Sequence, residues 1–239
     1  MLRRLITGAL ALTLMGCAGA STTPSPTRHP STSATPTPAA TPTPSPSPSA
    51  SADNQQVSVT SSGVGDYDLQ AYPVAVLDNL ATGHTANGVV AQFSVKSPSG
   101  SFSLDSVPVS LAPAQTLAVA ALCTDSCQGA TGVTVTVTVG SWSAGGASSL
   151  TASSASYACG SPCAGGHGYE GDASGTMSGD VSPGSLVNYF AACFSSSGAI
   201  VGGGWRQTVW IGSSSSISVS VPVLVTAQPA SCQLYASVA

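Results

Sequence analysis

Hydrophobic residues after position 56 recur at every second residue, in short runs. The clearest run is residues 133–139, in which valine alternates with threonine. The same alternation is seen in residues 89–95, 117–123, 187–193, 217–221 and 234–238. Strict alternation places one face of a strand in a core and the other in water, as in antiparallel sheets. No stripe of period 3.6 follows residue 17, so the pattern predicts an all-β fold.

The strand pattern also repeats along the chain. Ser97–Phe102 aligns with Ser195–Ile200 at a distance of 98 residues, and further strands align at 98 to 100. Each copy has the size of an immunoglobulin-like domain. We therefore predict two tandem Ig-like antiparallel β-sandwich domains, residues 56–140 and 147–239. A single larger sandwich is the alternative.

The first residues carry a targeting signal. Arg3 and Arg4 precede an apolar stretch, Leu5–Met15, of 11 residues. A bilayer core needs about 20 helical residues, so this stretch is too short to span a membrane and is typical of a signal peptide, residues 1–16.

The end of this signal, Leu14-Met15-Gly16-Cys17, resembles the lipobox of bacterial lipoprotein precursors. The resemblance implies cleavage before Cys17 and lipidation of its thiol, which would anchor the chain to the outer face of the cell membrane. Met15 departs from the small residues favoured at that position. The alternative is an ordinary secretory signal cleaved after Ala18 or Ala20.

Residues 17–55 are predicted to be a disordered linker. Proline alternates with serine or threonine over Ser21–Ala50, where Arg28 is the only charged residue. Proline fixes φ and lacks a backbone donor, so the stretch favours extended polyproline II. Such a segment indicates a spacer that lifts a domain away from the membrane, although a merely tolerated linker would look the same.

The folded region has a second, looser resemblance. Its order of strand, Ser-Gly turn, strand and Pro/Gly/Ser turn is similar to the small Ig-type repeats of exported Gram-positive lipoproteins, the FxLYD sort. The likeness covers about fifty residues per copy and lacks the motif that names those repeats.

The charge content excludes several functions. Only 6% of the residues are charged, too few for the Lys/Arg clusters of a nucleic-acid binder or for a coiled coil. The chain after Cys17 carries three cations, Arg28, Lys96 and Arg206, against nine acids, a net charge of −6. Such a surface repels anionic polymers and favours a neutral glycan or a protein partner.

Six cysteines remain after Cys17, an even number that favours disulfides in an exported chain. They are Cys123, Cys127, Cys159, Cys163, Cys193 and Cys232. Two pairs have CxxxC spacing and can each close a local loop, which leaves Cys193 and Cys232 on two core-facing strands. Fifteen pairings remain open, as does a four-thiolate metal site made of the two CxxxC pairs.

The polar residues of residues 159–180 are the main candidates for catalysis. We interpret this stretch as a long Gly-rich loop that holds His167, Glu170, Asp172 and Asp180. It could serve a metal or acid–base site, or simply be a solvated loop. The GxGxxG match at Gly166–Gly171 lacks the strand, helix and parallel sheet of a dinucleotide site and is a chance match.

Two more features are candidates for binding. Asp66-Tyr67-Asp68 supplies two carboxylates for a calcium ion between the domains, without the other ligands of an EF-hand. Trp205 and Trp210 lie five residues apart, so on a strand they point to opposite faces and at least one can be exposed to stack on a sugar or anchor a partner. The alternative, which we prefer, is that one fills the core and the other packs on the neighbouring domain.

We therefore expect a lipid-anchored cell-envelope protein of binding or scaffolding type, with no catalytic residues, metal or cofactor. The alternative is an envelope hydrolase or metal-dependent enzyme that uses the 159–180 loop. No Gly-x-Ser-x-Gly or His-Glu-x-x-His motif is present.

Overall fold

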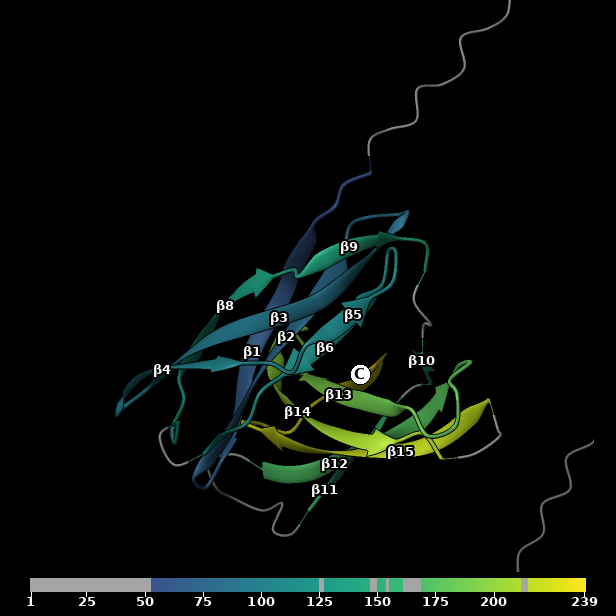
Figure 1. Ribbon diagram of the computed structural model, residues 1–239. Helices are drawn as coiled ribbons and strands as arrows, with labels where there is room; N and C mark the ends of the chain where they lie inside the picture. Colours follow the sequence, from purple (N-terminus) through teal and green to yellow (C-terminus); the bar gives the residue numbers. More distant parts are fainter. Residues whose placement is uncertain (1–52, 125–126, 147–149, 154, 161–168, 212–214) are drawn as a thin grey trace, which may run out of the picture. The chain divides into compact units, whose positions relative to one another are not determined.

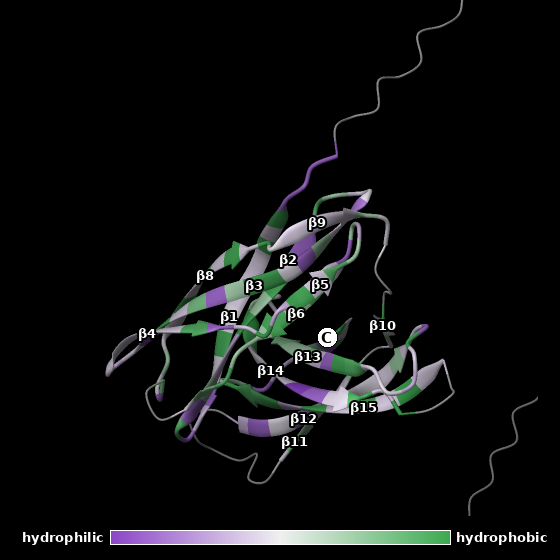
Figure 2. Cartoon of the chain, viewed as in Figure 1, coloured by the Kyte–Doolittle hydropathy of each residue, from purple (hydrophilic) through white to green (hydrophobic). Residues whose placement is uncertain are grey.

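The computed structural model describes residues 53–124, 127–146, 150–153, 155–160, 169–211 and 215–239. All regular secondary structure in these ranges is β-strand (Figure 1). The all-β prediction is confirmed. In Figure 2, hydrophobic residues alternate with polar ones along β3, as the sequence pattern requires.

The first half of the chain forms nine strands. They are β1 (Val57–Tyr67), β2 (Gln70–Asn79), β3 (His84–Ser97), β4 (Gly100–Asp105), β5 (Val109–Leu111), β6 (Thr116–Ala120), β7 (Cys123–Thr124), β8 (Gly132–Thr138) and β9 (Ser141–Ala144). The second half forms seven. They are β10 (Thr151–Ala152), β11 (Ser156–Cys159), β12 (Tyr169–Ser178), β13 (Leu186–Phe194), β14 (Ile200–Val209), β15 (Ser216–Val225) and β16 (Ser231–Val238).

The two halves follow the same pairing scheme. In the first half β2 pairs with β1 and β6, and β3 pairs with β4 and β8. In the second half β12 pairs with β11 and β15, and β13 pairs with β14 and β16. All of these pairs are antiparallel. The likeness in sequence therefore extends to a likeness in strand order.

The sheets pack as successive layers. The sheet β1-β2-β6 lies between the sheet of β3 on one side and strands β13, β14 and β16 on the other. Strand β2 is accordingly buried on both faces through its middle, Val74–Leu77. Beyond β13, strands β12 and β15 close the second half around a core of its own.

The faces of β13 show how the halves join. Tyr189, Ala191 and Cys193 point into the core of the second half, whereas Phe190 and Ala192 belong to the core of the first. One hydrophobic core is thus built by strands of both halves. The described residues, from Asp53 onward, belong to one compact unit.

Glycines allow the two halves to touch through their backbones. A Cβ at Gly65 in β1 would lie 1.8 Å from the carbonyl oxygen of Leu224 in β15 and 2.8 Å from the Cα of Gly202 in β14. Gly202 has a φ of 150°, and a Cβ on it would lie 3.0 Å from the Cα of Gly65. Side chains larger than hydrogen do not fit at this crossing.

A disulfide joins the central strands of the second half. Cys193 in β13 lies directly opposite Cys232 in β16, and the two form a disulfide as the sequence predicted. The equivalent pair in the first half is Val95 opposite Val133. The same core position is therefore filled by a covalent bond in one half and by two valines in the other.

Candidate functional site

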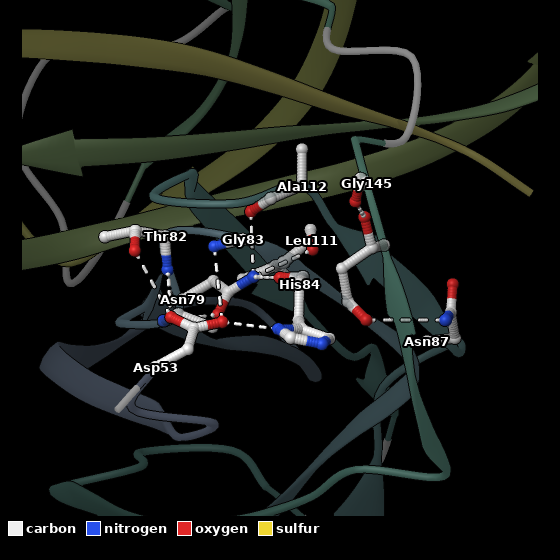
Figure 3. A network of polar contacts seen from close by, with 11 residues as sticks. Asp53, Asn79, Thr82, Gly83, His84, Asn87, Leu111, Ala112 and Gly145 are labelled. Atoms are coloured by element: carbon white, nitrogen blue, oxygen red, sulfur yellow. Dashed lines mark hydrogen bonds and ion pairs between the residues drawn. The ribbon is translucent and has the colours of Figure 1, made fainter. Parts of the chain in front are cut away.

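The best-defined polar network lies where the folded unit begins (Figure 3). The carboxylate of Asp53 accepts hydrogen bonds from the backbone N–H groups of Thr82, at 2.7 Å, and Gly83, at 3.2 Å. It also lies 2.5 Å from Nδ1 of His84. The folded unit therefore includes Asp53, which the sequence analysis assigned to the linker.

These contacts favour the charged form of Asp53. The hydrogen bond from His84, followed by that from the Thr82 backbone, holds the pKa of the Asp53 carboxyl below its ordinary value of 3.8. The aspartate is thus an anionic cap on the turn between β2 and β3.

A buried amide fixes the same turn from inside. Asn79 is 2% exposed, and its Nδ2 donates to the carbonyl oxygens of His84, Leu111 and Ala112 at 2.9 to 3.1 Å. Its Oδ1 accepts from the N–H of Ala81. The position of His84 is therefore set by the core. Within the described ranges the imidazole has no hydroxyl partner, so Asp53 and His84 do not complete a nucleophile-activating triad there.

The predicted 159–180 loop is in large part a strand. Residues 169–178 form β12, so its interpretation as one long loop is wrong. Gly171, Ala173 and Met177 face inward, and small inward residues give no hydrophobic alternation to detect. Glu170 and Asp172 lie exposed on the other face of β12, and Asp180 is exposed after its end. His167 lies outside the described residues.

The aspartates of β1 lie near this strand. Asp68 occupies the turn between β1 and β2 with a φ of 55°, and it lines a cavity of about 510 Å³ together with Glu170. The cavity therefore brings one carboxylate from each half together. No cluster of three or more His, Cys, Asp or Glu side chains suited to a metal occurs among the described residues.

The remaining cysteines follow the local spacing where they are described. Cys123 and Cys127 form a disulfide. Cys159 is also disulfide-bonded, and its expected partner Cys163 lies outside the described residues, as does Cys17. The two described disulfides leave no four-thiolate site made of both CxxxC pairs, because thiols in a disulfide do not ligate a metal as thiolates.

Neither predicted tryptophan forms an exposed binding surface. Trp210 is 1% exposed in the core of the second half, so it follows the packing alternative and offers no exposed ring to a ligand. Trp205 is half-buried, and its ring stacks on that of Phe190 with centroids 6.5 Å apart. It contributes to the packing between the halves.

A polar cluster that the sequence analysis missed lies on β15. Ser220 donates its hydroxyl proton to Oδ1 of Asp172 at 3.1 Å and accepts from the hydroxyl of Ser174 at 3.0 Å. Its carbonyl oxygen accepts from Nη1 of Arg206 at 2.9 Å. Asp172 and Arg206 are exposed, and each reaches Ser220 from a different strand. We call Asp172, Ser174, Arg206 and Ser220 the Ser220 cluster.

Hollows flank this cluster on both sides of β15. One has a volume of about 370 Å³ and is lined by Arg206, Val209 and Ile217 among others. The other has a volume of about 420 Å³ and includes Ser156 and Ser174. Ser218, Val219 and Ser220 line both, so the two hollows adjoin along one strand. We call them together the β15 groove.

No family of known proteins and no curated protein sequence matches the chain. Within the part of the chain that the structure describes, there is no helix of the length and hydrophobicity needed to cross a bilayer.

Proposed function

We propose that this chain is a lipid-anchored envelope protein that displays a rigid β-unit on a Pro/Ser/Thr stalk and acts by binding rather than catalysis. The lipobox at Leu14–Cys17 supports the anchor, and the proline pattern of Ser21–Ala50 supports the stalk. The membrane contact is made by the lipid on Cys17.

The observation that carries the proposal is the Asp53 junction. The folded unit starts within three residues of the last Ser/Pro segment, and its first described side chain is tied by three backbone or ring contacts to the β2–β3 turn. The folded unit thus begins at a residue that is held in place, directly after the predicted stalk. This arrangement suits a display function better than a loosely tethered one.

The distribution of polar groups favours binding over catalysis. The outer face of β4, β3 and β8 exposes hydroxyl and amide groups with one cation and one carboxylate. Its exposed residues are Gln92, Ser94, Lys96, Ser101, Ser103, Asp105, Thr134, Thr136 and Thr138. We call this surface the β3 face. It presents hydrogen-bonding groups without an acid–base pair among the described residues, so this face gives no support to a catalytic role.

Metabolic labelling with a radioactive fatty acid tests the anchor. The wild-type chain is expected to incorporate the label and to fractionate with membranes, and Cys17→Ser should abolish both. Ser21→Ala, four residues further on, is the matched control and should keep both. An unlabelled wild-type chain would overturn the proposed anchor.

A second measurement tests whether the polar residues of the 159–180 segment catalyse a reaction. The double variant His167→Ala/Glu170→Ala should leave the melting temperature and any ligand affinity unchanged. Loss of a hydrolytic activity of the wild type in this variant would replace the binding proposal with an enzymatic one.

A further inference from the structure

We infer that the β15 groove, centred on the Ser220 cluster, is a binding site for neutral saccharides. This inference rests on the proposed binding function and adds to it a place and a chemical class of ligand. The described part of the chain contains two cations, Lys96 and Arg206. Arg206 lines one of the two hollows and donates to the carbonyl oxygen of Ser220, whose hydroxyl is bonded to Ser174 and Asp172.

The donors and acceptors of the cluster complement sugar hydroxyls. A guanidinium presents five N–H donors in a fixed plane. Arg206 uses one of them, on Nη1, to donate to the carbonyl oxygen of Ser220. The carboxylate of Asp172 has several acceptor positions and receives one hydroxyl proton, from Ser220. Sugar hydroxyls both donate and accept, so the guanidinium and the carboxylate, which are bonded to different atoms of Ser220, can each engage a hydroxyl of one sugar chain.

The internal bonds of the cluster fix these groups before a ligand arrives. Ser174 orients the Ser220 hydroxyl, which in turn orients Asp172. Arg206 is held across the gap between β14 and β15, which pair with each other only at Gly202 and Gly203. Groups that are already ordered lose less conformational entropy on binding.

The walls of the groove suit the remaining surface of a sugar ring. Val209 and Ile211 line the hollow next to Arg206 and are exposed, so they can contact ring C–H groups. Hollows of about 300–1,000 Å³ are typical of sites for small ligands, and both hollows fall in this range. The net charge of −6 after Cys17 disfavours an anionic saccharide.

A peptide strand is the competing occupant, and the structure disfavours it. A strand that added to the open edge of β15 would need the edge carbonyl oxygens as acceptors. The Ser220 carbonyl oxygen already accepts from Arg206. Pro222, two residues further along the strand, supplies no N–H.

Calorimetric titration of the purified full chain tests the inference. The probes are cellohexaose, chitohexaose and maltohexaose, with a galacturonic acid hexamer as the anionic counterpart. At least one neutral hexasaccharide should bind saturably and more tightly than the anionic one. Asp172→Asn and Arg206→Gln should each weaken that binding about tenfold or more, because each removes a charge-assisted hydrogen bond.

The β3 face provides matched controls. Asp105→Asn changes an exposed strand carboxylate that accepts one amide bond from Gln92, at 3.3 Å, and Lys96→Gln removes the other described cation. Both variants should bind like the wild type. All four variants lie at exposed positions, and a thermal melt of each confirms that it is folded.

The inference is wrong if none of the three neutral sugars binds, if the controls weaken binding as much as the cluster variants do, or if only an extended peptide binds there. Each of these results leaves the lipid anchor standing, because fatty-acid labelling reports on Cys17 alone. Sugar binding by a chain that takes up no fatty acid would instead retain the groove and reject the anchor.

Discussion

The two halves of the folded unit use the same strand scheme but present opposite chemistry on one equivalent face. In the first half, the cross-strand row centred on β3 consists of Asp105, Gln92 and Thr136, and in the second half the row centred on β13 consists of Trp205, Phe190 and Tyr235. The polar row is exposed. The aromatic row is buried or half-buried, and it packs on the first half.

This difference decides where packing stops. An aromatic row covers the neighbouring sheet, and burial raises the pKa of the Tyr235 hydroxyl to about 12. If β3 carried the same row, the molecule would expose a hydrophobic face able to accept another copy head to tail. The polar row of β3 ends the stack after two halves and leaves the β3 face in water.

Replacement of the central aromatic residue, Phe190, should have the largest effect on the free energy of unfolding. Phe190→Ala removes a fully buried ring, and we expect a loss of about 3–5 kcal/mol in the free energy of unfolding by denaturant titration. Gln92→Ala, the matched change at the equivalent exposed position, should alter it by no more than about 0.5 kcal/mol.

The shape of the same unfolding curve tests whether the two halves share one core. Because both halves contribute to one core, Phe190→Ala should still unfold in a single transition at lower denaturant. Two separated transitions would show that the halves are stable without each other, which would contradict a shared core.

The disulfide offers the next largest effect. Cys193→Val/Cys232→Val gives the second half the valine pair that the first half has at Val95 and Val133. The bond spans a sequence separation of 39, and its loss should lower the free energy of unfolding by about 3–4 kcal/mol. The wild type with its disulfides intact is the reference. An unchanged stability would show that packing at this pair, rather than chain constraint, provides the stability.

The backbone crossing between the halves should respond to a single methyl group. Gly65→Ala places a Cβ against the Leu224 carbonyl, and we expect a loss of about 1–3 kcal/mol from overpacking. Gly132→Ala in β8 is the control, since a Cβ there meets nothing within 4 Å. Equal effects of the two substitutions would mean that the close approach at Gly65 adds no cost.

The sequence was sufficient to predict the fold class, because strands with one face in water alternate hydrophobic and polar residues. Residues 133–139 are the example, and β8 occupies most of them. It was insufficient for β12, where Gly171 and Ala173 fill the inward positions and leave no hydrophobic signal. It also could not show that the second half covers the first. Both faces of β13 are buried, with Phe190 on one face and Tyr189 on the other, so the strand has no polar face to read.

The candidate site was harder to predict for a related reason. Asp172, Arg206 and Ser220 come from three strands and meet through register, not through spacing in the sequence. The sequence directed attention to Trp205 and Trp210, which bracket Arg206. Their burial follows from the partner sheet and from the end of β14, neither of which a single strand pattern specifies.

The smallest expected effect concerns a feature that only the first half has, the Asp53 junction. The pKa of the Asp53 carboxyl is lowered in the folded state. The stabilising contribution of this carboxylate is therefore fully present above about pH 4 and is lost as the pH falls through the folded-state pKa. Asp53→Asn should therefore lower the melting temperature slightly at pH 7, and its curve should converge with that of the wild type in acid.

A double-mutant cycle tests the same contact. Adding His84→Gln to Asp53→Asn should lower the melting temperature by less than His84→Gln alone does, because the two side chains share one contact. Additive losses, or a difference between Asp53→Asn and wild type that persists in acid, would show that the junction does not depend on the aspartate charge. In that case the start of the folded unit is held by the neighbouring backbone contacts, such as the bond from the Leu80 N–H to the Gln56 carbonyl.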